Sequence, residues 1–185
     1  RVQSLNQHGQ FRFIQPHPAL KRYLSSYYFF EIDAGDELPQ DDLLYPEWAS
    51  ARFMLRGSIP AAVVPDPLED VPRVSMTGPT SRAVRIQCVS AVMAGIGMLP
   101  LGWMKFCSPS ADAHGDRVVD VESEPGFALF AAIWQDIKSL TDPESIAAKF
   151  DEYLLAALKI ASENPAKELE IERVHAALAN PEIAD

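Results

Sequence analysis

Long apolar runs and cysteine are both scarce in this 185-residue chain. No apolar stretch approaches the roughly 20 residues that a membrane-spanning helix needs, and the first seven residues are too polar for a secretory signal peptide. Two cysteines, Cys88 and Cys107, are too few for a disulfide framework, and each lies among apolar neighbours. We therefore predict a soluble cytoplasmic protein with reduced, structural cysteines and no membrane partner.

Positive charge is also scarce. The chain has 16 Lys and Arg residues against 26 Asp and Glu residues, which gives a formal net charge of −10. A surface this acidic repels the phosphate backbone of nucleic acids. We therefore expect that the chain does not bind DNA by itself.

Sequence signatures of catalysis and of metal binding are missing. The four histidines, His8, His17, His114 and His175, form no HxH or HExxH pattern and have no carboxylate at ligand spacing, so we expect surface or loop histidines. There is no GxSxG, Walker or GxGxxG motif, and packing within a strand explains Gly95-Ile-Gly97 better than phosphate binding does. We predict no catalytic residues, no metal site, no cofactor and no enzymatic activity.

What the sequence does contain is an apolar centre at residues 84–106. Residues 84–88 alternate between apolar and polar side chains, which is the period of a half-buried strand. Residues 92–99 are almost wholly apolar and are predicted to form a second, buried strand. Pro100 then fixes φ at the first turn of a predicted helix.

Strands are predicted before this centre. Aromatic and β-branched residues at 27–32 and the alternation at 51–55 are typical of strands. Residues 33–42 are acidic and contain Gly and Pro, so they are predicted to form a loop, with the next strand beginning at Leu43.

Helices are predicted after the centre. Ser123 is expected to cap a helix that runs to Ile137, and Asp142-Pro143-Glu144 is a strong start signal for a longer amphipathic helix. Further start signals stand at Asn164-Pro165 and at Asn180-Pro181-Glu182. We therefore divide the chain into a β-rich part (1–122), a helical extension (123–180) and the start of a truncated further domain (181–185).

Two groups of side chains are candidates for function. The first is aromatic and basic, and it either lines a ligand cavity between sheet and helices or, for its aromatic members, simply forms core. The second is the apolar face of the helix that begins at Pro143, which either covers the sheet or pairs with a second subunit. The candidate ligand-binding residues are Tyr28, Trp48, Arg52, Phe53, Arg56 and Trp103, and the candidate dimer-interface residues are Phe150, Tyr153, Leu154 and Leu158.

A series of short motifs, considered in order and spacing, also resembles one known family. The motifs are His17-Pro-Ala-Leu20, residues 27–32, Tyr45-Pro-Glu-Trp48, residues 53–57, Val74-Ser-Met-Thr-Gly78, Val84-Arg-Ile86, Gly95-Ile-Gly97, Pro100-Leu-Gly-Trp103 and residues 116–121. Together they resemble the N-terminal, non-DNA-binding domain of AraC-type transcriptional regulators, over residues 12–180.

The expected fold is α+β, with a small, partly open antiparallel β-barrel of cupin-like character followed by C-terminal helices. The resemblance implies a bacterial regulatory domain that senses a small-molecule effector or mediates dimerisation. A dimerisation module without any ligand is the alternative. In that family helix-turn-helix units follow the sensor-like domain, so DNA would be bound only through a domain beyond residue 181. We also expect a homodimer, because a two-fold operator requires two subunits at a fixed spacing.

Overall fold

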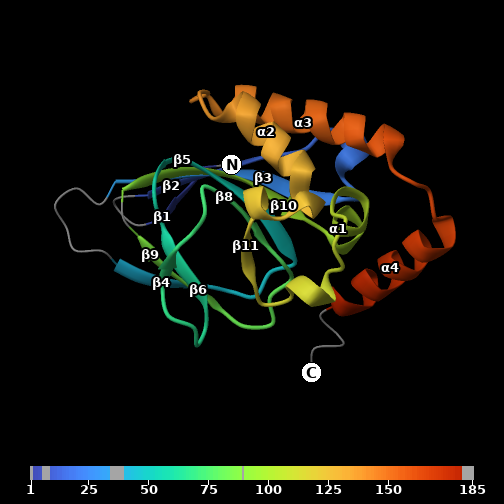
Figure 1. Cartoon of the computed structure of the whole chain (residues 1–185), viewed down its shortest axis with the longest axis horizontal. Helices are drawn as coiled ribbons and strands as arrows, with labels where there is room; N and C mark the ends of the chain where they lie inside the picture. The colour runs from blue at the N-terminus through green and yellow to red at the C-terminus, as the bar shows by residue number, and fades with distance from the viewer. Residues whose placement is uncertain (1, 6–8, 34–39, 89, 181–185) are drawn as a thin grey trace.

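Two antiparallel sheets and four α-helices make up the part of the chain that the computed structural model describes, namely residues 2–5, 9–33, 40–88 and 90–180 (Figure 1). The fold is therefore α+β, as the sequence predicts. Within these residues the strands form two separate sheets and do not close into a single barrel. Residues 181–185, the predicted start of a further domain, lie outside the described part, and the division into domains stays a prediction.

The larger sheet has seven strands and carries most of the core. Its strands lie in the order β1-β2-β3-β10-β5-β8-β11, and every neighbouring pair is antiparallel. Their bounds are β1 (Val2–Leu5), β2 (Gly9–Ile14), β3 (Leu24–Ile32), β10 (Ala91–Met98), β5 (Ala49–Gly57), β8 (Val74–Thr77) and β11 (Val118–Asp120).

The smaller sheet has four strands in the order β4-β9-β6-β7. Their bounds are β4 (Gln40–Leu44), β9 (Val84–Cys88), β6 (Pro60–Val63) and β7 (Glu69–Asp70). The predicted strands at 84–88 and 92–99 are thus confirmed as β9 and β10, but they belong to different sheets.

The helices follow the last long strand. Pro100 opens the short α1 (Pro100–Phe106), as predicted, and Asp142 caps α3 (Pro143–Ile160) by accepting a hydrogen bond from the backbone N–H of Ser145. The remaining helices are α2 (Ala128–Ile137) and α4 (Pro165–Leu178). In Figure 1, α2 and α3 cover the face of the larger sheet that lies opposite the smaller sheet.

Side chains alternate between two cores because the larger sheet is covered on both faces. Tyr27, Phe53 and Ile96 belong to the main core, which they share with buried side chains of α2 and α3 such as Phe130 and Phe150. The intervening strand residues face the smaller sheet, where a second core gathers Phe30, Met54, Ile59, Ala91 and Met93. The molecule therefore has three layers, with the larger sheet in the middle.

Two predicted elements need correction. Asp41 and Asp42, expected in a loop, pair with β9 inside β4, and Leu43 lies near the end of that strand rather than at the beginning of the next one. Aspartate has a low strand propensity, and pairing with a distant strand overrides it. Ser123 caps no helix: it lies in a 3-10 turn, and α2 begins later, at Ala128.

Candidate functional site

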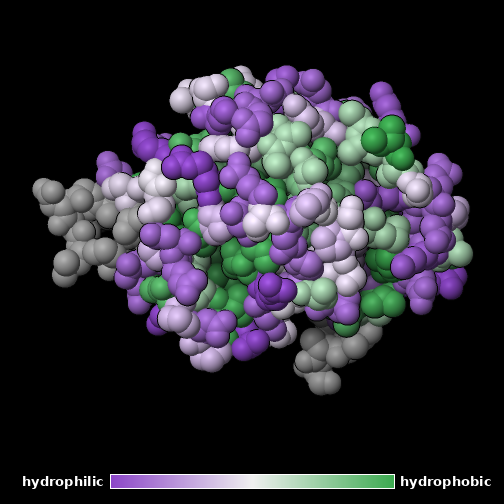
Figure 2. All heavy atoms as spheres, in the orientation of Figure 1, coloured by the Kyte–Doolittle hydropathy of each residue, from purple (hydrophilic) through white to green (hydrophobic). Residues whose placement is uncertain are grey.

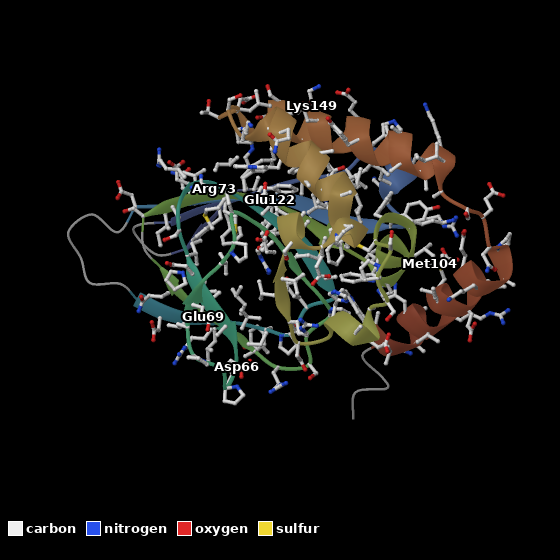
Figure 3. All side chains as sticks on the ribbon, in the orientation of Figure 1. Asp66, Glu69, Arg73, Met104, Glu122 and Lys149 are labelled. Atoms are coloured by element: carbon white, nitrogen blue, oxygen red, sulfur yellow. The ribbon has the colours of Figure 1, made fainter. Side chains whose placement is uncertain are left out.

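A cavity of about 560 Å3 lies between the two sheets. Both sheets contribute apolar side chains to its wall, among them Phe11, Phe13, Phe30, Ile32, Leu44, Ile59, Val84, Ile86 and Met93. In Figure 3 the labelled Glu69 lies in the smaller sheet, whereas the labelled Lys149 lies on α3 at the opposite side of the molecule. The volume of this cavity and its mainly apolar lining are typical of a site that binds a small molecule.

One wall of the cavity is aromatic. The rings of Phe11 and Phe13 are stacked, with centroids 5.7 Å apart, and the ring of Phe30 lies 4.9 Å from that of Phe11. Phe11 and Phe13 are two residues apart on β2, so both side chains emerge on the same face of the sheet. This wall suits a flat or extended apolar molecule.

A row of residues in register crosses the larger sheet at the polar end of the cavity. Tyr28 on β3 is paired with Gly95 on β10, Gly95 with Arg52 on β5, and Arg52 with Ser75 on β8. Residues that are paired across antiparallel strands project from the same face. Arg52 and Ser75 accordingly both line the cavity.

Arg52 is largely buried and its charge is balanced locally. The side chain is 13% exposed, and its guanidinium donates hydrogen bonds to the Glu47 carboxylate and to the Thr77 hydroxyl. Burial acts to lower the pKa of Arg52, but Tyr28 and Glu47 outweigh it and raise that pKa above its usual value. The guanidinium therefore stays charged, within a neutral pair.

One buried hydroxyl group near Arg52 has no partner. Among the described residues, the side-chain oxygen of Ser75 has no hydrogen-bond partner, whereas the hydroxyl of Tyr28 interacts with Arg52 and Ser50. Burial is the main cause that raises the pKa of Tyr28, although Arg52 opposes it, so the phenol stays protonated and able to donate. Unsatisfied buried hydroxyls are costly, and Ser75 lies directly on the cavity wall.

The mouth of the cavity is partly acidic. Asp41, Asp42, Leu43 and Tyr45, in or just after β4, line the cavity and are exposed. Figure 2 shows hydrophobic side chains, in green, within a hollow that has a polar rim. The sequence pattern did not point to Asp41 and Asp42 as lining residues, because the acidic segment 33–42 predicts a loop. The alternation at 84–88 indicates a half-buried strand, and such a strand needs a neighbouring strand to pair with. That requirement was the available signal for β4.

The structure brings only part of the predicted ligand-binding set together. Arg52 lines the cavity, and Tyr28 lies beside it. Phe53 is buried on the opposite face of the sheet against Phe150, since neighbouring residues of a strand point in opposite directions. Arg56 lies on the surface in an ion pair with Glu31.

The two tryptophans of that set lie elsewhere. Trp103 on α1 is buried beside Phe127, and its indole N–H donates to the carbonyl oxygen of Pro109 at 2.8 Å. Trp48 is 37% exposed and meets the ring of His175 on α4 edge to face. Neither residue lines the cavity.

The candidate dimer-interface residues share one face of α3 but differ in burial. Phe150 and Leu154 are fully buried in the main core, with the ring of Phe150 lying 5.1 Å from that of Tyr27. Tyr153 and Leu158 are only partly buried. The centre of this face thus covers the sheet of its own chain.

His114 has a structural role. It lies in the connector after α1, consistent with the expected surface or loop position, but it is buried there, with one ring nitrogen 2.8 Å from a carboxylate oxygen of Glu124 and the other 3.1 Å from the carbonyl oxygen of Ser110. His8 lies outside the described residues. Within the described part of the chain, no three His, Cys, Asp or Glu side chains gather closely enough to hold a metal ion. No helix described by the structure is both long and apolar enough to cross a membrane.

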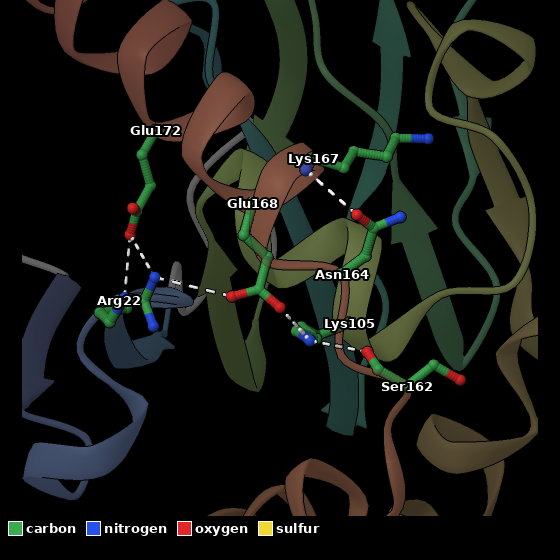
Figure 4. A network of polar contacts seen from close by, with 7 residues as sticks. All are labelled: Arg22, Lys105, Ser162, Asn164, Lys167, Glu168 and Glu172. Atoms are coloured by element: carbon green, nitrogen blue, oxygen red, sulfur yellow. Dashed lines mark hydrogen bonds and ion pairs between the residues drawn. The ribbon is translucent and has the colours of Figure 1, made fainter.

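Helix α4 is held to the rest of the chain by charged groups. It has no buried residue, and Figure 4 shows its Glu168 between Lys105 of α1 and Arg22, which also pairs with Glu172. Lys105 and Glu168 are only 5% and 12% exposed, and Lys105 also donates to the carbonyl oxygen of Ser162 at 2.9 Å. Hydrogen bonding to Lys105 is the main cause that lowers the pKa of Glu168.

No protein-family model matches the sequence, and no curated protein matches it. Several solved structures show weak likenesses, among them structures of three different proteins. KdgF from Halomonas sp. is 9% identical, with a TM-score of 0.37 over 52% of this chain and 86% of that one. Two variants of oxalate decarboxylase from Bacillus subtilis are each 14% identical, with TM-scores of 0.41 and 0.39 over 76% of this chain and 37% of each of theirs.

The third protein is the AraC-like transcriptional activator CuxR, at 9% identity and a TM-score of 0.43, over 98% of this chain and 72% of that one. The likenesses thus include cupin-type proteins and an AraC-like activator, all at low identity. Every TM-score is below 0.5, so none of them bears on the function proposed below.

Proposed function

We propose that this chain is the effector-sensing regulatory domain of an AraC-type transcription regulator, with a cupin-like arrangement of its two sheets. The observation that carries the proposal is the cavity of about 560 Å3 with apolar walls and one polar end. The role is binding rather than catalysis, and DNA is contacted only through a separate domain. The motifs described in the sequence support the family, and the cavity supports the sensing.

The larger sheet connects the cavity with the helices. Arg52 projects into the cavity, and the next residue, Phe53, packs against Phe150 of α3. A ligand that shifts β5 therefore also shifts the contact between β5 and α3. The ligand changes the populations of the helix arrangements only if it binds one arrangement more tightly than another.

A fluorescent apolar probe, N-phenyl-1-naphthylamine, tests the binding. We expect one probe per chain, with binding lost in Ala61→Trp, which fills the cavity from β6, and kept in the control Ala156→Trp, at an exposed position of α3. Hydrogen exchange tests the regulation: the bound probe should change the protection of α2 and α3. Binding without any change in the helices would contradict a regulatory role.

A dimerisation module without a ligand is the second candidate. Exposed apolar side chains on α4 favour it, since Leu169, Val174 and Leu178 are 49%, 54% and 65% exposed. Light scattering at tens of micromolar tests for the proposed homodimer. A dimer that binds no probe supports this second function, and a monomer that binds the probe supports effector sensing alone.

A further inference from the structure

The polar end of the cavity limits what kind of molecule the site accepts. This inference rests on the proposed function, and it concerns the chemistry of the ligand. Three features of the cavity define that chemistry: the apolar walls, the paired charge of Arg52, and the unpartnered hydroxyl of Ser75.

The first feature sets the body of the ligand. Phe11, Phe13 and Phe30 form one continuous aromatic wall, and Ile59 and Met93 add to the lining. A polar body such as a sugar would leave most of its hydroxyl groups without partners against these side chains. The cavity therefore favours a ligand whose body is apolar.

The second feature sets its charge. Glu47 already accepts a hydrogen bond from Arg52, and it also accepts one from Ser50 at 3.3 Å, so the positive charge is neutralised before a ligand arrives. A carboxylate placed beside Arg52 would also lie near the Glu47 carboxylate, and on its way in it would pass Asp41 and Asp42. An ammonium head group would pass Asp41 and Asp42 favourably, but at the polar end it would lie beside the guanidinium of Arg52 and, having no acceptor, could not satisfy its donors. Both kinds of charged head group are disfavoured.

The third feature sets the polar group. Ser75 is 1% exposed, and its side-chain oxygen has no partner among the described residues. It lines the cavity beside Arg52, its register partner on the neighbouring strand. A hydroxyl can both donate and accept, whereas the guanidinium of Arg52 can only donate. A carbonyl or hydroxyl oxygen on the ligand would satisfy such donors without adding charge.

We propose that the cavity binds a neutral amphipathic molecule, with its apolar body against the phenylalanine wall and a single carbonyl or hydroxyl group at Ser75 and Arg52.

Displacement of N-phenyl-1-naphthylamine by three ten-carbon compounds tests this proposal. Decanamide, decanoate and decylammonium share an apolar body and differ in the charge of the head group. At neutral pH we expect decanamide to displace the probe at a concentration at least tenfold lower than either charged compound. Equal or stronger displacement by decanoate or decylammonium would overturn the ligand class while leaving the proposed sensing function intact. Failure of the folded chain to bind the probe or any of the three compounds would overturn both.

Two variants identify the polar end. Ser75→Ala should weaken decanamide by about three- to tenfold, the contribution of one hydrogen bond, and should leave probe binding unchanged. Ser58→Ala, at an exposed serine outside the cavity, is the control and should change neither. Probe binding by the variants reports that the cavity is intact. Unchanged decanamide binding in Ser75→Ala would overturn the assignment of the head group to this residue.

Glu47→Gln tests the charge argument directly. Glutamine keeps a carbonyl oxygen that can accept from Arg52 and Ser50 but removes the negative charge. The guanidinium then lacks a counter-charge, and we expect the ratio of decanoate affinity to decanamide affinity to rise at least tenfold. A ratio that does not change would show that Arg52 does not set the charge preference of the site, and it would overturn this part of the proposal.

Discussion

The ring of Tyr28 lies across the backbone of Gly95, so closely that a β-carbon at position 95 would stand 2.0 Å from the Cζ atom of Tyr28. Glycine at this position of β10 thus lets the tyrosine side chain cross the central strand toward Arg52. The pair thereby brings Tyr28 close to Arg52, which lines the cavity.

Gly95→Ala should therefore destabilise the fold. The tyrosine ring must move, and overpacking of this kind costs about 1–3 kcal/mol of unfolding free energy. Urea denaturation measures the loss. In a Tyr28→Ala background the same glycine substitution should cost little, because the ring is gone. An equal loss in both backgrounds would show that Tyr28 is not what requires the glycine.

Phe150→Ala should cost about 3–5 kcal/mol of unfolding free energy, as is typical for a buried aromatic side chain. Its ring lies between Tyr27 and Phe53 in the main core. Ile160→Ala, at a residue of the same helix that is 87% exposed, is the control and should change stability by less than about 0.5 kcal/mol. For the same reason, Phe150→Asp combined with Leu154→Asp should give an unfolded chain. A folded, monomeric double variant would show that the face belongs to a dimer interface.

Trp103→Ala should also cost about 3–5 kcal/mol, because the indole is 4% exposed. Trp103→Phe keeps most of the apolar contact but leaves the carbonyl oxygen of Pro109 without its donor, so it should cost less. Thermal melts measure both, with Trp48→Ala as the matched control at a more exposed tryptophan. If Trp103→Ala had the same melting temperature as the parent, the Trp103 side chain would not contribute to the stability of the core.

The cap of α3 should make stability depend on pH. Hydrogen bonding to Ser145 is the main cause that lowers the pKa of Asp142. A carboxyl group whose pKa is lower in the folded chain stabilises the fold above its unfolded-state pKa, and this contribution is lost as the pH falls through the folded-state pKa.

Asp142→Asn keeps an oxygen that can cap the helix but removes the titration. The difference in urea midpoint between parent and variant should favour the parent at pH 7 and shrink in strongly acidic solution. Other carboxyl groups with lowered pKa values, such as Asp112 and Asp116, are common to both proteins and cancel in this difference. A difference that does not depend on pH would contradict the prediction.

Removal of the charge at Lys105 should loosen α4 alone. Lys105→Met takes away the group that holds Glu168 and Ser162, while α4 contributes no buried residue to the core. Backbone amides of α4 should exchange faster with solvent, and those of α2 and α3 should not change. Lys138→Met is the control, because this lysine directly follows α2 and its side chain donates to Gln135 of that helix. Uniformly faster exchange would mean that Lys105 supports the whole fold.

The sequence predicts the elements better than it predicts the site. Alternation and helix start signals are local, so the strands at 27–32, 51–55 and 84–88 and the starts of α1, α3 and α4 could be recognised. The same alternation predicts that Arg52 and Phe53 point to opposite faces of the sheet, so only one of the two can line a given cavity.

The cavity itself depends on distant pairings. It forms because β4 pairs with β9, and because Tyr28, Gly95, Arg52 and Ser75 meet in register on four strands. Register between distant strands is set by packing in three dimensions, and a single sequence carries no signal for it. His114 lies in a polar connector, as expected of a loop histidine, but the local sequence carries no signal for its burial against Phe127 and Glu124.

Residues of β5 face the cavity and the helices alternately, and this alternation affects how substitutions in this strand act. Positions 52 and 54 belong to the side of the cavity, and positions 51 and 53 to the side of the helices. Substitutions at alternate positions of the same strand can therefore change what the cavity accepts without altering how the helices pack. A library restricted to cavity-facing positions of the larger sheet would explore new ligands on a constant helical framework, and the two properties can diverge independently in related proteins.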